Sequence, residues 1–371
     1  MKRLLIILTI LLTACQSNTS NSTDNSSKKG KALRQQIDSI YKKAFKPNEP
    51  GVAVLISYDN RKVVAQGYGL RNIKTQQPIT PNTNMEIASA SKQFTALAIL
   101  SLVDDGKLSL SDTVSQFLAY ESFKNVTIEQ LINHTSGLAD AEAYFYENWD
   151  PSKVATNQDV INWYAKKDRK VDEPGKNFHY NDGTYEVLPV IVEKVSGKDY
   201  AAYLKENVFK LAGMNSSVAY NLNDPVNIKE RAHYYQTDSL GNWIQQDGHP
   251  LTGLFGAGGI YTSLNDYFNY DKALRERAMF SDSIHQLIFK PSSTYRENDQ
   301  KKQYAMGWHI NDSLAEHYGG WYGVNSLTRH YLDRPLTLAF FANRNDLFEK
   351  DLIHLTDSIA RNYLEQEQLE D

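Results

Sequence analysis

The chain carries, from position 85 to position 97, the stretch Met85-Glu86-Ile87-Ala88-Ser89-Ala90-Ser91-Lys92-Gln93-Phe94-Thr95-Ala96-Leu97. Apolar residues continue at helical spacing to position 103, which predicts that Ser89 opens a buried helix with Lys92 three positions later on the same face. An ammonium would then lie beside a hydroxyl. A serine becomes a nucleophile when a nearby base takes its proton, and a helix N-terminus favours the developing negative charge. The alternative is that Ser89 only caps a core helix.

The same spacing of serine and lysine occurs twice more, and the surroundings separate the three places. Ser26 lies in a polar tract, and Ser39 falls inside an amphipathic helical pattern. Ser89, in contrast, follows two predicted strands and begins a nearly all-apolar helix. The context therefore favours Ser89 as the reactive serine.

The charge balance excludes several classes of partner. The chain has 40 basic and 44 acidic residues, a net charge of −4, without long runs of either sign. Nucleic acid and acidic polymers are therefore not expected as partners. We expect neither a metal nor a cofactor, since no His-Glu-x-x-His motif and no cluster of histidine and cysteine occurs. A Gly-x-Ser-x-Gly elbow is also absent from the sequence, which argues against an α/β-hydrolase.

The N-terminus has the pattern of a secretory signal. Lys2 and Arg3 precede an apolar run over 4–12 that is too short to span a bilayer. The run ends in Leu12-Thr13-Ala14-Cys15, which resembles a bacterial lipoprotein cleavage box and implies lipid attachment at Cys15, the only cysteine. The alternative is a chance cysteine beside an ordinary cleavage site. We therefore expect a signal peptide over 1–15, and a membrane-anchored, extracytoplasmic protein.

The rest of the chain divides into a tether and one folded unit. Residues 16–31 are mostly Ser, Asn, Thr and Lys, a composition typical of a flexible tether. The folded domain is expected over 32–371. Helical patterns cover 32–45, 126–133, 157–167, 183–195, 198–211, 264–278 and 347–364. Strand patterns cover 52–57, 62–68, 304–310, 324–331 and 336–342.

These patterns predict an α/β (α+β) fold. One antiparallel sheet is built from N- and C-terminal strands and flanked by helices, and a helical lobe is inserted at about 138–250, where no strand pattern stands out. Two further segments carry chemistry. Tyr180 precedes a predicted helix, so its phenol can project from a loop into a cleft. The segment Glu316-His317-Tyr318-Gly319-Gly320-Trp321-Tyr322-Gly323 lies between the first two C-terminal strand patterns, and its glycines allow a substrate to approach the backbone closely.

Taken together, the chain resembles the serine hydrolases of the class C β-lactamase type, a family that includes D-alanyl-D-alanine carboxypeptidases, penicillin-binding esterases and D-aminopeptidases. The likeness covers about 32 to 364 and follows the order of the family's motifs. It rests on Ile87-Ala88-Ser89-Ala90-Ser91-Lys92-Gln93-Phe94-Thr95, Leu131-Ile132-Asn133-His134-Thr135-Ser136-Gly137-Leu138, Tyr180-Asn181-Asp182, Gly258-Gly259-Ile260-Tyr261-Thr262-Ser263 and His317-Tyr318-Gly319.

The resemblance implies a β-lactamase/transpeptidase-like fold and an acyl-enzyme mechanism. Ser89 would attack a carbonyl, with Tyr180 and Lys92 sharing the proton transfers. Tyrosine titrates near pH 10, so we expect the charge of Lys92 to favour the phenolate. The oxyanion hole would be the backbone N–H groups of Ser89 and Gly320, and Gly319 would belong to the substrate-binding strand.

Two residues depart from the family's pattern. His317 stands where β-lactamases usually have a lysine that holds the substrate carboxylate, so penicillin-like substrates lose an anchor. Asp182 stands where an asparagine would donate a hydrogen bond to the substrate. Asp182 could pair with Lys92, bind a cationic amine of the substrate, or merely cap the helix expected to start at Gly183.

The expected function is cleavage of an ester or of an amide or peptide bond through acyl-Ser89, as in an esterase, a D-aminopeptidase or a carboxypeptidase. Its partners would be a small-molecule or peptide substrate and, through the lipid, a membrane. One alternative is a class C-like β-lactamase. Another is a catalytically inactive lipoprotein of the same fold that only binds its ligand. His134 is expected to be structural, and Trp321, Tyr322 and Tyr146 are candidates for the cleft wall.

Overall fold

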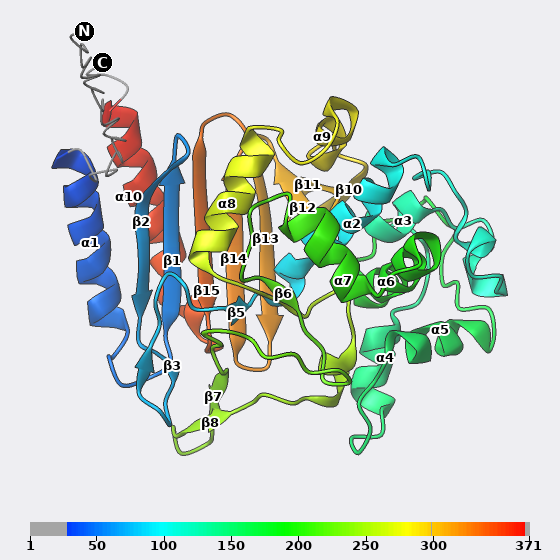
Figure 1. The fold of residues 1–371 in the computed structure, drawn as a ribbon, viewed down its shortest axis with the longest axis horizontal. Coiled ribbons are helices and arrows are strands. Elements are labelled where there is room, and N and C mark those ends of the chain that lie inside the picture. Colours follow the sequence, from blue (N-terminus) through cyan, green and yellow to red (C-terminus); the bar gives the residue numbers. More distant parts are fainter. Residues whose placement is uncertain (1–27, 298, 368–371) are drawn as a thin grey trace, which may run out of the picture.

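The fold is built around one large antiparallel sheet, seen in a computed structural model that describes residues 28–297 and 299–367. Its eight strands follow the order β10-β11-β12-β13-β14-β15-β1-β2 (Figure 1). The strands are β10 (Ser293–Glu297), β11 (Gln300–Ala305), β12 (Trp308–Asn311), β13 (Leu314–Trp321), β14 (Val324–Tyr331), β15 (Leu336–Ala342), β1 (Val52–Tyr58) and β2 (Arg61–Tyr68). The two ends of the chain thus meet where β1 pairs with β15.

The N-terminal hairpin shows how local sequence produces this sheet. β1 is a run of β-branched and apolar residues that is buried on both faces. Asp59 and Asn60 form its turn with positive φ angles of 49° and 55°, a conformation that these two residue types tolerate. The predicted hairpin, and with it the antiparallel sheet made from both ends of the chain, is confirmed.

Helices cover both faces of the sheet. On one face α1 (Lys28–Ala44) and α10 (Leu352–Glu367) pack against β1, β2, β14 and β15 and bury residues such as Leu33, Ile37 and Phe340. On the other face lie α2 (Lys92–Asp104), α8 (Leu264–Arg275) and α9 (Asp282–Ile288), which belong to the larger core. The nearly all-apolar α2 is buried along most of its length, as its sequence predicts.

A helical lobe stands beside the sheet, on the right in Figure 1. It contains α3 (Ile128–Ile132), α4 (Ala141–Asn148), α5 (Asn157–Ala165), α6 (Asp182–Ser196), α7 (Tyr200–Leu204) and a π-helical turn (Lys205–Phe209). Short 3₁₀ turns are η1 (Ala88–Ser91), η2 (Val114–Gln116), η3 (Glu121–Phe123), η5 (Pro250–Gly253) and η6 (Leu347–Lys350). In the sequence, the lobe is inserted between the N-terminal strands β1 and β2 and the C-terminal strands β10 to β15, as expected.

Minor strands correct the prediction that 138–250 has none. β6 (Val218–Ala219) joins β5 (Met85–Glu86) and β9 (Ile260–Thr262), and β7 (Tyr235–Thr237) pairs with β8 (Trp243–Gln245). β3 (Leu70–Asn72) pairs with β4 (Gln77–Pro78). Strands of two or three residues are too short to leave a periodic pattern in the sequence.

Other features also differ from expectation. The strand pattern over 304–310 spans two strands, β11 and β12, which pair as a hairpin. The segment from Glu316 to Trp321 is not a connection but most of β13, because pairing with β14 outweighs its glycines. The helices α4 and α9 and the strand β10 were not predicted. α1 begins at Lys28, so residues 28–31 are helical rather than part of the tether, and the remainder of the tether lies outside the described residues.

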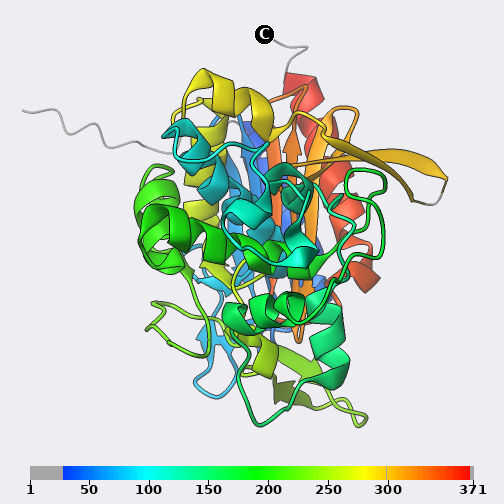
Figure 2. The same ribbon diagram turned by 90° about the vertical axis from the view of Figure 1, so that its right-hand side faces the viewer.

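The β10–β11 hairpin projects beyond the body of the molecule at the end of the sheet (Figure 2). Within the described ranges 28–297 and 299–367, no helix combines the length and the apolar character needed to cross a membrane. The predicted signal peptide and Cys15 fall outside those ranges.

Candidate active site

Ser89 lies on a sharp turn between a strand and a helix. β5 ends at Glu86, η1 covers Ala88–Ser91, and α2 begins at Lys92. Ala88 has a φ of +44°, a strained value for a residue with a Cβ atom, and such strain is typical of functional turns. The turn leaves the half-buried Ser89 at the wall of a cavity, at the start of the predicted helix.

Lys92 is completely buried yet charged. Its ammonium donates a short hydrogen bond to Oδ1 of Asp182 and a 3.2 Å hydrogen bond to the carbonyl of Ala257. Burial lowers the pKa of Lys92, but the charge of Asp182, followed by that of Tyr180, outweighs it, so the net shift is upward. Lys92 therefore stays protonated in the resting site.

Tyr180 lies on the loop before α6, as predicted, and its ring faces the Lys92 ammonium at 4.9 Å from the ring centroid. Although 37% of Tyr180 is exposed, desolvation of its hydroxyl group raises the pKa of Tyr180 to about 12, against the charge of Lys92 and hydrogen bonds with Lys92 and Ser89. As expected, the charge of Lys92 favours the phenolate, but desolvation and the carboxylate of Asp182 together outweigh it in the resting site.

Asp182 is the first residue of α6 and is paired with Lys92. The helix is capped not by Asp182 but by Asn181, whose side chain accepts a hydrogen bond from the N–H of Thr184. The proposed capping role of Asp182 is therefore wrong. Its carboxylate instead holds the buried ammonium across 90 positions of sequence.

β13 passes directly against the Ser89 turn, and this contact requires glycine. A Cβ atom at Gly319 would lie 2.3 Å from the carbonyl oxygen of Ile87 and 2.3 Å from Oγ of Ser326. Gly320 follows on the same strand and lines one cavity together with Ser89. This arrangement is compatible with the predicted oxyanion hole, which needs donors on both sides of a reacting carbonyl.

His317 is buried beneath the site, with 1% of its surface exposed. Its Nδ1–H donates to the carbonyl of Tyr318 at 2.7 Å, and its Nε2 accepts from the hydroxyl of Tyr304 at 3.2 Å. Burial, reinforced by the charge of Lys92, lowers the pKa of His317 well below its usual range. The ring is thus neutral and supports β13, and direct contact with a substrate remains a prediction.

His134 positions the loop that carries Tyr180. Its Nδ1 accepts a hydrogen bond of 3.1 Å from the N–H of Asn181, and its ring packs against Tyr180 at 4.4 Å between centroids. His134 itself adopts a positive φ of 57°. Of the three aromatic candidates, Trp321 lines the cavity beside Ser89, and Tyr146 stacks with Tyr322.

Two hollows meet at Ser89. One is a cavity of about 130 Å³ between the helical lobe and the sheet, lined by Gly320, Trp321 and four acidic residues. The other is a wide groove of about 930 Å³, bordered by the projecting hairpin. Its lining includes Tyr180, Tyr295, His309, His317 and Tyr318.

The acidic residues Glu86, Glu142 and Glu186 were not identified from the sequence as parts of the site. Glu186 follows Asp182 by four positions, which places both on one face of α6. The available signal was that Glu186 interrupts the apolar residues of a buried helix. Glu142 left no such signal, because it reaches the cavity from α4, which was not predicted.

Comparisons with known proteins agree with this geometry. The family model described as Beta-lactamase matches residues 34–360. The chain is 29% identical to Penicillin-binding protein 4* of Bacillus subtilis over 328 residues, which cover 84% of this chain and 72% of the relative. It is also similar to the crystal structure of a penicillin binding protein from Bacillus halodurans, at 26% identity and a TM-score of 0.76, covering 88% of this chain and 98% of the other.

A D-amino acid amidase from Ochrobactrum anthropi SV3 shares the fold, with a TM-score of 0.75 at 19% identity over 92% of this chain and all of the other. The large antiparallel sheet, the inserted lobe and the family match confirm the predicted fold class. On these grounds the chain belongs to the beta-lactamase family and is a serine hydrolase.

Proposed function

We propose that this protein is an extracytoplasmic, membrane-anchored hydrolase that cleaves an ester or an amide or peptide bond through an acyl-Ser89 intermediate. The observation that carries the proposal is the junction of Ser89, Lys92 and Tyr180 at the meeting point of two hollows. One hollow can hold the acyl part of a substrate and the other its leaving group.

In the acylation step, Oγ of Ser89 bonds to the carbonyl carbon and its proton passes to the Tyr180–Lys92 pair. Because Lys92 and Tyr180 are both protonated at rest, Tyr180 first releases its proton to the solvent of the groove that it lines, and the resulting phenolate then accepts the proton of Ser89. The backbone N–H groups of Ser89 and Gly320 would stabilise the oxyanion. The bond to the leaving group then breaks, the leaving group takes a proton from the same pair, and water later releases the acyl group.

The β-lactamase alternative is less well supported by the site. His317 is neutral and buried where a fixed positive charge would hold the carboxylate of a penicillin. An ester or an amide without that carboxylate does not need the positive charge, so histidine at position 317 does not weaken its binding. We therefore place esterase and aminopeptidase-like activity first.

The test is intact-mass spectrometry of the domain after exposure to a fluorophosphonate. We expect one adduct on the wild-type protein and none on Ser89→Ala. Ser91→Ala serves as the matched control, because Ser91 lies on the same turn but its Oγ accepts a hydrogen bond from the N–H of Ile260. A folded wild-type protein without an adduct would contradict the proposal.

The membrane anchor is tested separately. In a bacterial host fed an alkyne-tagged fatty acid, the full chain should become labelled and Cys15→Ser should not. An unlabelled full chain released in soluble form would refute the lipid attachment but leave the hydrolase proposal intact.

A further inference from the structure

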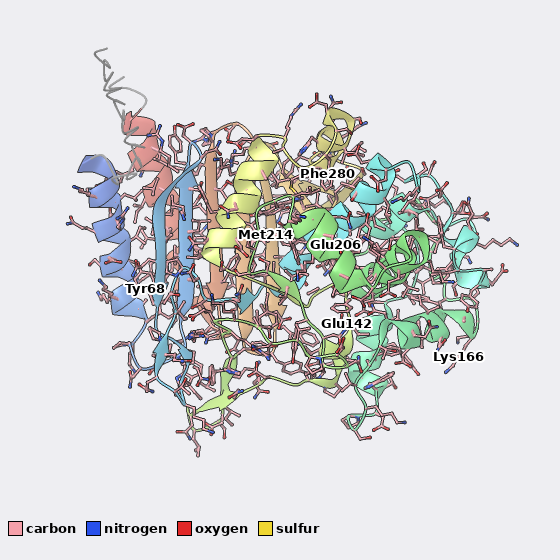
Figure 3. All side chains as sticks on the ribbon, viewed as in Figure 1. Tyr68, Glu142, Lys166, Glu206, Met214 and Phe280 are labelled. Atoms are coloured by element: carbon pink, nitrogen blue, oxygen red, sulfur yellow. The ribbon has the colours of Figure 1, made fainter. Side chains whose placement is uncertain are left out.

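The cavity of about 130 Å³ beside Ser89 is strongly acidic. Its lining includes the carboxyl groups of Glu86 on β5, Glu142 on α4, and Asp182 and Glu186 on α6. Glu142 lies where the lobe meets the sheet (Figure 3). Three separate elements therefore direct carboxyl groups at one small space that also contains the nucleophile.

The charges of these groups are not balanced by the protein. Asp182 is paired with Lys92. The neighbouring Asp140 accepts hydrogen bonds from the backbone N–H groups of Asp182 and Gly183. No salt bridge within the described ranges engages Glu142 or Glu186. The cavity thus holds more carboxyl groups than cations.

The environment of Glu186 gives independent evidence that the cavity receives a cation. The Glu186 side chain is completely buried, and no backbone N–H or cationic side chain of the described residues donates a hydrogen bond to either carboxyl oxygen. The group that faces Glu186 is another carboxyl, that of Glu142. A buried pair of carboxyl groups without a cation is costly and rare, and it calls for a ligand that supplies one. Oε2 of Glu86, which borders the same cavity, also lacks a partner among the described residues.

The pKa values of Glu142 and Glu186 are both raised, as expected for carboxyl groups that lack a neighbouring cation. Burial, reinforced by the charge of Asp182, raises the pKa of Glu142 to about 7. Burial and the nearby carboxyl of Glu142 raise the pKa of Glu186 well above its usual range. Without a ligand, the site therefore favours the protonated form of Glu186, and a bound cation would take the place of that proton.

We propose that this cavity is a cation subsite that receives the primary ammonium group of the acyl part of the substrate. The preferred substrates are then aminoacyl esters, aminoacyl amides or peptides with a free amino terminus. This inference rests on the proposed acyl-Ser89 mechanism and adds the substrate class.

The lining favours an organic ammonium over a metal ion. Across residues 28–297 and 299–367, no group of three His, Cys, Asp or Glu side chains is arranged to hold a metal. The remaining walls include Leu251, Leu254 and Trp321, which suit the carbon atoms of a short acyl group. Because Gly320 and Ser89 line the same cavity, an acyl group bound to Ser89 would extend toward the carboxyl groups.

The experiment compares four benzyl esters: those of the two configurations of alanine, of N-acetylalanine and of propionate. Release of benzyl alcohol is followed by chromatography. For one configuration of alanine, we expect kcat/KM to exceed that of propionate by about a hundredfold, the typical consequence of one buried charge pair. In Glu186→Gln and in Glu142→Gln, the ratio of the two values should fall toward unity.

Glu147→Gln is the matched control, because Glu147 lies on α4 but is exposed and does not border the cavity. This variant should keep the wild-type ratio. Equal values for the alanine and propionate esters in the wild type, or an unchanged ratio in both glutamine variants, would overturn the cation subsite. If Glu186→Gln does not fold, Glu142→Gln decides alone.

A second readout requires no turnover. Alaninamide should slow fluorophosphonate labelling of the wild type more than propionamide does, and this difference should disappear in Glu142→Gln. Equal protection by the two amides would contradict the subsite while labelling itself still supports an activated Ser89. Absence of both labelling and ester cleavage would instead refute the proposed function.

Discussion

The two hollows that meet at Ser89 differ in size and in charge. The cavity next to the lobe is small and carries four carboxyl groups, whereas the groove on the other side is about seven times larger. The inner wall of the groove is neutral, because burial lowers the pKa of His317 and brings that of His309 to about 4. A small charged cavity discriminates between ligands, and a wide neutral groove accepts many. The acyl part of the substrate should therefore be recognised strictly and the leaving group loosely.

The largest effect should follow from a change on the groove side, where we propose Tyr180 as the proton acceptor. Tyr180→Phe keeps the ring that packs on His134 but removes the hydroxyl. We expect kcat to fall by about a thousandfold with every ester, since the loss of a general base typically costs 10²–10⁴ in rate. Steady-state kinetics with the propionate ester measures this. A loss of less than tenfold would mean that Lys92 accepts the proton without Tyr180.

Next in size is the effect of His134, which supports Tyr180 from below. His134→Ala removes the acceptor for the N–H of Asn181 and leaves a gap under the phenol ring. We expect kcat to fall by about tenfold with little change in KM, because misplaced catalytic groups slow the reaction more than they weaken binding. His179→Ala, an exposed histidine of the same loop, is the control. A change confined to KM would contradict a positioning role.

A third prediction concerns Asp182, which lines the acidic cavity and whose charge acts on Tyr180 in the groove. Its charge raises the pKa of Lys92 and that of Tyr180. Removing the charge in Asp182→Asn lowers both values, so the proton acceptor becomes available at lower pH. With the uncharged propionate ester, the rising alkaline limb of the kcat/KM profile should move down by about one pH unit. A limb that stays in place would show that Asp182 does not control the proton transfer.

The smallest effect should be on stability, through Glu142. Its pKa is raised in the folded protein to about 7 from an ordinary value of 4.5. Between these values the folded state binds more protons than the unfolded state, so the associated stability is present below pH 4.5 and lost as the pH rises through 7. Glu142→Gln should therefore raise the melting temperature at pH 8 relative to the wild type by a few degrees, and by less at pH 5. Differential scanning calorimetry at both pH values measures the difference, and a pH-independent difference would contradict the assignment.

Local sequence determined the elements that depend on near neighbours. The β1–β2 hairpin follows from β-branched runs separated by Asp59 and Asn60, and α2 follows from an apolar pattern that begins after Ser89. These elements are encoded over a few residues, so their periodicity is visible in the chain. The order of the motifs also indicated the family, and hence the sheet assembled from both termini.

Only the tertiary structure decided how the site is charged. Asp182 meets Lys92 across 90 positions, and Glu142 and Glu186 come from different helices to one cavity. β13 became a strand because β14 supplies its hydrogen-bond partners, which the glycines of that segment could not indicate. The pKa values of Lys92 and Tyr180 depend on the balance of burial and charge, and both quantities arise from residues that are distant in sequence. The proposed nucleophile, Ser89, could therefore be identified from the residues next to it in the sequence, whereas its acidic surroundings exist only in the folded chain.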